Sequence, residues 1–171
     1  MEETAKEIAA PSGPPLHIVL FEPESAANVG AVGRTCVGVG AKLWLVRPLG
    51  FQIDDRKLKR AGLDYWPALD WEAVDDWNAL LRRMAETKGV AASESDFYYF
   101  TKKAVRDYDD VAFRRGDVFV FGPESRGLPD SFFEGKPDRG LRIPIRPQIR
   151  SLNLSVSVAV ASFEARRQLR F

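Results

Sequence analysis

The chain has 171 residues, 45% hydrophobic and 29% charged, which are ordinary values for one globular domain with a full-sized core. It contains one cysteine, Cys36, and one histidine, His17, so an internal disulfide and a Cys/His metal site are both excluded. The net charge is only +1, no apolar run approaches ~20 residues, and the N-terminus lacks a signal-peptide layout, so we expect a cytoplasmic protein without membrane contact.

Apolar runs and helical spacing alternate along the chain. Strands are predicted at residues 16–21, 42–46, 97–101, 117–121 and 141–145, and helices at residues 26–39, 71–87 and 152–169. Strands that alternate with helices predict an α/β domain with a mainly parallel sheet and helices on both faces. Residues 1–15 are rich in proline and poor in apolar side chains, so we expect a flexible N-terminal tail ahead of a single domain at residues 16–171.

Two loops in the last third of the chain are dense in glycine, proline and polar groups. The first begins at Gly122, directly after the strand predicted at 117–121, and the second follows the strand predicted at 141–145. Ligands bind at the carboxyl ends of strands in open α/β sheets, so these loops predict one small-molecule pocket with polar backbone walls. A structural role is also open, because Ser151 or Asn153 can cap the last helix.

The first predicted helix is rich in Gly, Ala and Val and carries one arginine, Arg34. The only Gly-x-Gly, from Gly38 to Gly40, precedes a strand instead of opening a helix, so a dinucleotide fingerprint is absent. An arginine among small apolar residues needs a partner, and either an anionic ligand or a carboxylate would serve. Residues 134–171 hold eight Lys or Arg against three acids, which can form a local positive face or a solvated helix surface.

Several segments, read together, resemble the SPOUT class of RNA methyltransferases. They are Asn28-x-Gly30 with Arg34, Phe-Gly-Pro-Glu-Ser-Arg-Gly-Leu-Pro at 121–129, and the stretch from Arg142-Ile-Pro-Ile to Arg-Ser-Leu-Asn-Leu-Ser at 150–155. Two further segments make the resemblance more specific, Phe-Glu-Pro-Glu at 21–24 and Lys-Arg-Ala-Gly-Leu-Asp-Tyr at 59–65. With them the chain is similar to the small tRNA 2′-O-methyltransferases that modify wobble position 34 of leucine tRNAs, over roughly residues 16–171.

The resemblance implies a fold, a cofactor and partners that patterning does not give. It implies a SPOUT domain whose C-terminal part forms a deep trefoil knot, S-adenosylmethionine as cofactor with S-adenosylhomocysteine as product, no metal, and a homodimer acting on the anticodon stem-loop of tRNA. The implied cofactor-binding residues are Phe100, Gly122, Glu124, Ile143, Ser151 and Leu152. The implied catalytic residues are Arg34 (from the facing subunit), Arg150 and Asn153, and the implied RNA-binding residues are Arg34, Arg150 and Phe163.

The chemistry of methyl transfer gives these positions sense. Transfer from a sulfonium to a ribose 2′-hydroxyl is an in-line displacement that depends on alignment and loss of the hydroxyl proton and needs no metal. Arg34 is a poor base, since an arginine pKa exceeds ~12, so we expect it to bind phosphate and polarise the hydroxyl, with the base unassigned. DNA lacks this hydroxyl and is not expected as a partner. Two alternatives stay open: the same chemistry on another tRNA position or on rRNA, and a non-catalytic, RNA-binding knotted dimer.

Overall fold

The computed structural model describes residues 13–53, 64–88 and 96–171. The described strands form one seven-stranded sheet in the order β3-β2-β1-β6-β4-β7-β5, and all neighbouring strands run parallel. The strands are β1 (Leu16–Phe21), β2 (Lys42–Val46), β3 (Trp71–Val74), β4 (Phe97–Phe100), β5 (Arg106–Asp107), β6 (Asp117–Phe121) and β7 (Gly140–Arg142). The predicted parallel α/β fold is therefore confirmed.

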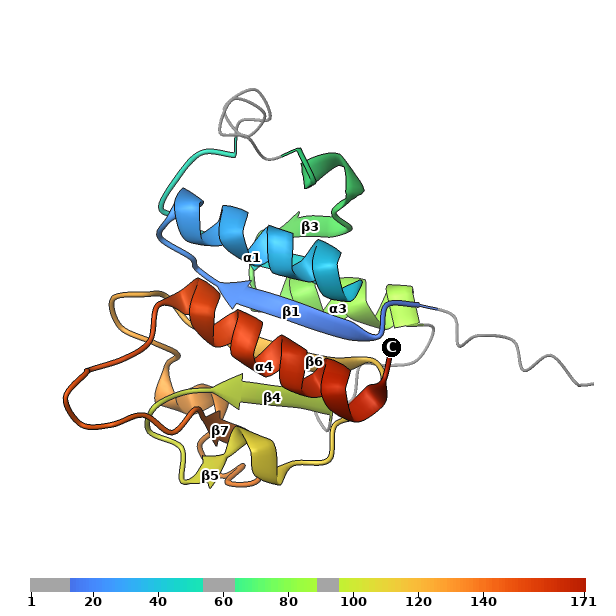
Figure 1. The fold of residues 1–171 in the computed structure, drawn as a ribbon. Coiled ribbons are helices and arrows are strands. Elements are labelled where there is room, and N and C mark those ends of the chain that lie inside the picture. Colours follow the sequence, from blue (N-terminus) through green and yellow to red (C-terminus); the bar gives the residue numbers. More distant parts are fainter. Residues whose placement is uncertain (1–12, 54–63, 89–95) are drawn as a thin grey trace, which may run out of the picture.

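Helices cover both faces of the sheet. In Figure 1, α1 (Ala26–Val39) and α4 (Leu154–Leu169) lie in front of the strands and α3 (Trp77–Lys88) lies behind them. Short 3-10 helices form at η1 (Trp66–Ala68), η3 (Tyr108–Asp110) and η4 (Asp130–Phe132). Among the described residues, no helix is both long and apolar enough to cross a membrane.

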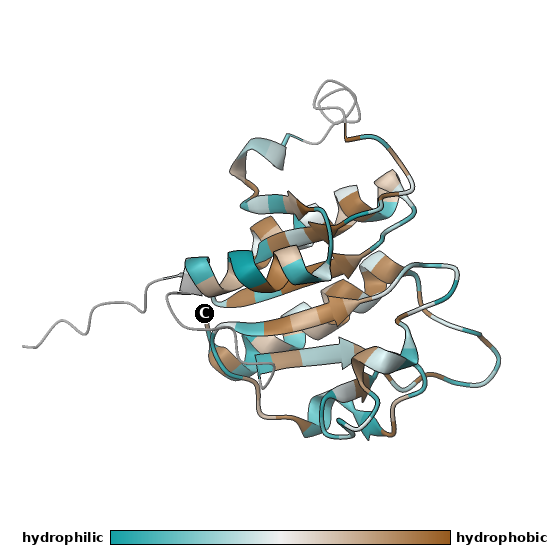
Figure 2. Ribbon diagram, turned by 180° about the vertical axis from the view of Figure 1, so that it is seen from behind, coloured by the Kyte–Doolittle hydropathy of each residue, from teal (hydrophilic) through white to brown (hydrophobic). Residues whose placement is uncertain are grey.

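The strands are apolar on both sides because both faces are covered. In β1, Leu16, Ile18 and Leu20 belong to the core on the α1/α4 side, and Val19 belongs to the core on the α3 side. β4 divides in the same way, with Phe100 on the first side and Tyr99 on the second. Figure 2 shows hydrophobic residues concentrated along the central strands. A strand with both faces buried reads as a continuous apolar run, which is why these strands were predictable.

The predicted helix at 71–87 is wrong in its first part. Residues Trp71–Val74 form β3, which pairs in parallel with β2 from Leu43 to Val46. The helix begins at Trp77, after Asp76, whose carboxylate accepts a hydrogen bond from the Ala79 N–H at 2.7 Å. Spacing within the segment cannot reveal the open edge of β2, and pairing with that edge overrides the local pattern.

Three other boundaries move by a few residues. The last predicted strand, 141–145, is only Gly140–Arg142 and ends before Pro144, whose nitrogen cannot donate to a ladder. The terminal helix begins at residue 154 instead of 152, because Asn153 caps it, and β4 ends at residue 100. The predicted tail lies outside the described residues up to residue 12, while the Pro15 carbonyl already accepts a hydrogen bond from Gly116.

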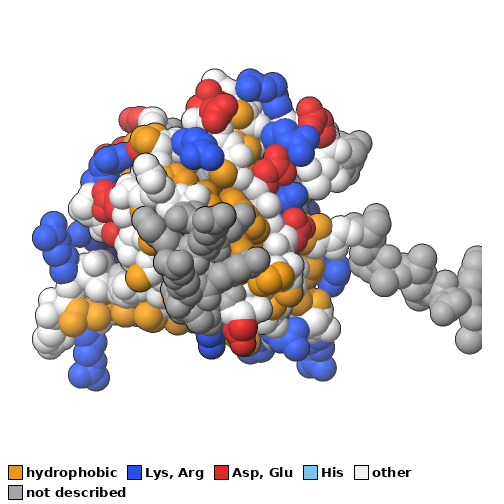
Figure 3. Space-filling view, turned by 90° about the horizontal axis from the view of Figure 1, so that it is seen from above, with side chains coloured by type: hydrophobic (Ala, Val, Ile, Leu, Met, Phe, Trp, Pro, Cys, Tyr) orange, Lys and Arg blue, Asp and Glu red, His pale blue; other side chains and the backbone are white. Residues whose placement is uncertain are grey.

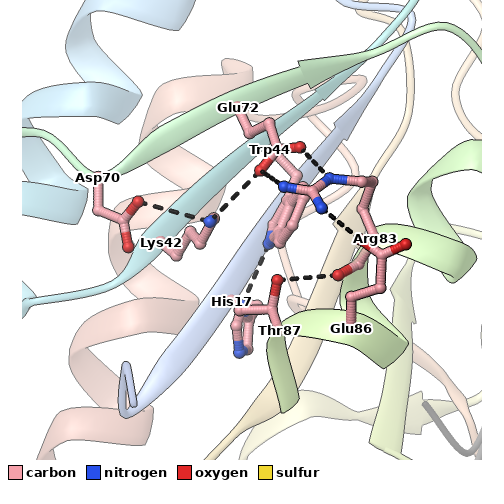
Figure 4. A network of polar contacts seen from close by, with 8 residues as sticks. All are labelled: His17, Lys42, Trp44, Asp70, Glu72, Arg83, Glu86 and Thr87. Carbon is pink, nitrogen blue, oxygen red and sulfur yellow. Dashed lines mark hydrogen bonds and ion pairs between the residues drawn. The ribbon is translucent and has the colours of Figure 1, made fainter. Parts of the chain in front are cut away.

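A polar network joins β1, β2, β3 and α3 on the face behind the sheet (Figure 4). Buried His17 accepts a hydrogen bond from the Trp44 indole at Nδ1, at 3.1 Å. Lys42 Nζ lies 4.4 Å from the centre of the Trp44 ring and 3.5 Å from Glu72. Arg83 of α3 donates to Glu72 at 2.6 Å, and this hydrogen bond lowers the pKa of that carboxyl. The cations of this network are therefore neutralised by carboxylates within the chain.

Candidate active site

A cavity of about 770 Å³ opens at the carboxyl edge of the sheet, where β4, β6 and β7 end. Its walls come from the turn after β4, the loops after β6 and β7, and the first turn of α4. Small-molecule sites typically measure ~300–1,000 Å³, so the cavity is large enough for a ligand of nucleoside size. The two loops singled out from the sequence do meet at one pocket.

Two glutamates fasten the loop after β6 to the start of α1. The Glu124 carboxylate accepts hydrogen bonds from the backbone N–H groups of Glu24 at 2.8 Å and Ser25 at 3.1 Å. In return, the Glu24 carboxylate accepts from the Ser125 N–H at 3.0 Å and the Ser125 hydroxyl at 2.5 Å. Hydrogen bonds to a charged acceptor are the strong ones, so this exchange fixes one wall of the pocket against α1.

Asn28 extends the connection from Glu124 to α4. Its Nδ2 donates to Glu124 at 3.0 Å, and its Oδ1 accepts from Asn153 Nδ2 at 3.0 Å. Asn153 Oδ1 accepts from the Ser155 N–H at 2.8 Å, which caps α4. Burial tends to raise the pKa of Glu124, but the hydrogen bonds from Asn28 and from backbone N–H groups outweigh it and leave that pKa below its ordinary value. Glu124 is therefore held as a carboxylate.

Gly122 lets the backbone of the pocket wall close on itself. A Cβ at this position would lie 2.3 Å from the Leu128 nitrogen and 2.4 Å from the Gly127 carbonyl carbon. These are backbone atoms, so a larger residue would have to displace the loop. The glycine thus lets the loop backbone pass close to itself, so that this wall of the pocket is formed by main-chain groups.

Arg34 lies outside this pocket, on the exposed side of α1. Its guanidinium carbon is 4.8 Å from the centre of the Tyr65 ring, and the Tyr65 hydroxyl donates to the Gly30 carbonyl, one helical turn before Arg34. No carboxylate of the described residues lies within ion-pair distance of Arg34. The partner expected from the sequence, an anion or a carboxylate, is in this single chain an aromatic ring.

The sequence matches the model of a known protein family over most of its length. The SpoU rRNA Methylase family model covers residues 15–163, which include α1 and both pocket loops. The chain belongs to the SpoU rRNA methylase family. The predicted C-terminal knot follows from that membership. In the sheet, β6 and β7 each lie between two strands that precede them in the chain.

Individual members of the family match nearly the whole chain. The tRNA (cytidine(34)-2′-O)-methyltransferase of Burkholderia cenocepacia is 44% identical over 156 residues, covering 91% of this chain and 96% of that protein. A structure solved for insight into 2′-OH methylation of C/U34 on tRNA is 42% identical, with a TM-score of 0.79 over 91% of this chain and 96% of that one. The SpoU methyltransferase AviRb of Streptomyces viridochromogenes, solved with AdoMet, shares the fold at 19% identity, with a TM-score of 0.75 over 94% of this chain and 60% of its own.

The structure brings most of the predicted site residues together at the pocket and leaves two apart. The pocket is lined by Phe100, Gly122, Glu124, Ile143, Arg150, Ser151, Leu152 and Asn153. Arg34 lies on α1 and Phe163 lies on α4 with 53% of its surface exposed, and neither contributes to the pocket of the single chain. The roles assigned to these residues stay predictions.

Sequence reasoning missed several contributors to the site. Thr101 and Lys102 line the pocket after β4. Asn28, which the sequence identified only as part of a motif, links the pocket to α4. The exchange between Glu24 and Glu124 joins positions 100 residues apart, and a single sequence carries no signal for such a pairing. The position of Thr101 and Lys102 directly after a buried strand is a signal that could have been used.

The other reactive groups of the described chain lie away from this site. Burial raises the pKa of the Cys36 thiol to about 12, so Cys36 is a packing residue of α1 and not a nucleophile. No cluster of three or more His, Cys, Asp or Glu side chains that could hold a metal occurs within residues 13–53, 64–88 and 96–171.

Proposed function

We propose that this protein transfers a methyl group from S-adenosylmethionine to the ribose 2′-hydroxyl of the wobble pyrimidine, position 34, of tRNA, with leucine tRNAs as the main substrates. The observation that carries the proposal is the 44% identity to a tRNA (cytidine(34)-2′-O)-methyltransferase over 91% of the chain. The pocket supports it, because residues implied by the family motifs line one cavity of about 770 Å³.

The pocket residues fit the proposed cofactor. AdoMet, when bound, supplies the methyl group and a neutral leaving group, S-adenosylhomocysteine. Main-chain groups around Phe100, Gly122 and Ile143, with the turn at Ser151 and Leu152, would hold it, and the closeness of Gly122 to Leu128 shapes that cradle. We assign Glu124 the task of fixing the cradle, since its carboxylate is already engaged by backbone N–H groups.

The cationic and amide groups at the mouth of the pocket would act on the RNA. Arg150 and Asn153 lie at the pocket, exposed, where the ribose must approach the methyl group. Arg34 would bind the phosphate beside the target and polarise the hydroxyl. Holding the 2′-oxygen in line is the main contribution open to the protein, and such positioning can supply several of the roughly 7–11 kcal/mol available from alignment. No residue is assigned as the proton acceptor.

We further propose that two copies form the active unit. The exposed side of α1 carries Ala27, Ala31 and Arg34 at helical spacing, and the neighbouring α4 exposes Val156 (46%) and Phe163 (53%). An exposed apolar surface on adjacent helices is typical of an interface. A dimer through this surface would bring Arg34 of one copy toward the pocket of the other, with Phe163 near the anticodon stem-loop. We expect the dimer to act in the cytoplasm, where tRNA is used.

The same family supports a second candidate substrate. Its description names rRNA, so 2′-O-methylation of ribosomal RNA by the same pocket is the alternative. The remaining alternative is a non-catalytic RNA-binding dimer. Excess AdoMet would not raise the melting temperature of such a dimer, whereas it would raise that of a protein that binds AdoMet.

The deciding experiment offers labelled AdoMet to the purified protein with unfractionated tRNA and, in parallel, with rRNA. After digestion, the methylated nucleoside and its position are identified. A 2′-O-methylpyrimidine at tRNA position 34 supports the proposal. Label at another tRNA position, or only in rRNA, would show that the proposed substrate is wrong. An absence of label together with an absence of AdoMet binding would contradict the proposed activity itself.

A further inference from the structure

Arg34 is an exposed cation that is oriented without being neutralised. On the opposite side of the sheet, Arg83 is bound to a carboxylate, that of Glu72. Arg34 instead lies over the Tyr65 ring at 4.8 Å from its centre. A carboxylate at this distance would compete with any phosphate for the guanidinium, whereas an aromatic face attracts the cation without neutralising its charge.

Tyr65 is itself fixed to the helix that carries Arg34. Its hydroxyl donates to the Gly30 carbonyl, which in the helical pattern also accepts from the Arg34 N–H. Both ends of Arg34 are therefore connected to the same turn of α1. The backbone is connected through the helix, and the guanidinium is connected through the Tyr65 ring. Burial raises the pKa of the Tyr65 phenol, and a hydrogen bond from Arg34 and its positive charge only partly oppose that rise. The phenol therefore stays protonated and can donate to the Gly30 carbonyl.

The segment after Tyr65 is anchored against α1 by packing. Trp66 and Leu69 are buried, and a Cβ on Gly33 would lie 3.1 Å from each of their side chains. Gly33 therefore gives the space in which this segment lies directly on the helix, one residue before Arg34. The position of the Tyr65 ring is thus set by the core and not by the arginine.

We propose that Tyr65 is a positioning residue for methyl transfer, whose ring holds the Arg34 guanidinium in the direction in which it meets the RNA while leaving its charge available. The inference rests on the proposed function, because it needs Arg34 to act on the RNA. Misplacement of a catalytic group by about 1 Å can reduce a rate by 10²-fold. The ring is the part of Tyr65 that matters most, with the hydroxyl as a secondary tether.

The test compares Tyr65→Leu with Tyr65→Phe, measuring the single-turnover methyl-transfer rate, the tRNA affinity and the AdoMet affinity of each. Tyr65→Leu is expected to lower the rate by about 10- to 100-fold while leaving the AdoMet affinity unchanged, because Tyr65 does not line the pocket. Tyr65→Phe keeps the ring and is expected to retain the rate within about 3-fold, losing only the hydrogen bond to Gly30. Tyr108→Leu is the matched control, since Tyr108 is also a half-buried tyrosine beside an arginine, Arg167, and lies away from α1.

A double-mutant cycle then separates positioning from folding. If Tyr65 acts through Arg34, adding Tyr65→Leu to Arg34→Ala produces no further loss of tRNA affinity or of the residual rate. Three results would each overturn the inference. They are a full further loss of rate when Tyr65→Leu is added to Arg34→Ala, a loss of AdoMet affinity in Tyr65→Leu as large as its loss of rate, and a Tyr65→Leu protein as active as wild type. Failure of the wild-type protein to methylate RNA would instead contradict the proposed function.

Discussion

The two faces of the sheet differ in how particular exposed side chains are held. Behind the sheet, Lys42 and Arg83 are paired with carboxylates, and α3 closes the core with aromatic contacts such as Trp77 against Phe97. In front, Arg34 has a ring for a partner and α4 exposes Phe163. Ion pairs also occur on α4, where Arg167 is bound to Glu164. Arg34 and Phe163, however, keep a charge and an apolar side chain on this face available for other molecules.

Charge is also distributed along this division. Seen from above, Lys and Arg side chains project at the left end of the molecule and along the lower right edge, and hydrophobic side chains lie along the lower left (Figure 3). The left end is where the strands finish in Figure 1 and where the pocket opens. A basic rim next to an apolar surface suits a nucleic acid, whose phosphates bind cations and whose bases stack on apolar side chains.

The largest effect is expected for Arg34, and Arg83 on the other face of the sheet is its control. Arg34→Ala should reduce methyl transfer by at least about 10³-fold with AdoMet affinity nearly intact, because it removes a group that would act on the RNA and does not line the pocket. Arg83→Ala should leave activity unchanged and lower the melting temperature only slightly, since exposed ion pairs contribute little to stability. Single-turnover assays and thermal melts of both variants check this. If Arg34→Ala lost AdoMet binding as strongly as it lost methyl transfer, the assignment of Arg34 to RNA binding would be wrong.

The next effect concerns the apolar surface of α4. Val156→Asp places a charge on the surface where we propose that two copies meet, and an interface position that matters costs about 2 kcal/mol or more. We expect sedimentation to show a shift toward monomer, with a parallel fall in activity. Val105→Asp is the control, because Val105 is 88% exposed on the turn between β4 and β5. An active, stable monomer in either protein would refute the shared site.

The smallest effect is a dependence of stability on pH that originates at Glu124. Its pKa is lowered in the folded protein, so its hydrogen bonds stabilise the fold above the unfolded value of about 4.3 and are lost as the pH falls through the folded value. Glu124→Gln should lower stability by about 1–2 kcal/mol at pH 7 and flatten the decline of melting temperature below pH 5. Glu134→Gln, at an exposed glutamate whose carboxylate makes no hydrogen bond to the described residues, should change neither. A pH profile identical to wild type would show that Glu124 is not the group responsible.

The features that the sequence predicted are those encoded by neighbouring residues. Buried strands appear as apolar runs, and the turns after Phe121 and before Leu154 carry their own glycine, proline and polar residues, so the pocket could be placed. Features that depend on pairing across the chain were missed or misread. Residues Trp71–Val74 became a strand because β2 offers an edge, and the partner of Arg34 comes from Tyr65, 31 positions later. The Glu24–Glu124 exchange is hidden for the same reason.

The strand order has a consequence for how the chain is made. β6 lies between β1 and β4, and β7 lies between β4 and β5, so each late strand must enter between strands synthesised before it. Contacts between distant segments form slowly, because the loops that join them must close first. Most of the residues that line the pocket come after β4, and the last of them lie at the start of α4. A chain that has not yet placed β6, β7 and the start of α4 lacks most of the pocket lining, so binding of a ligand in the pocket would report that these elements are in place.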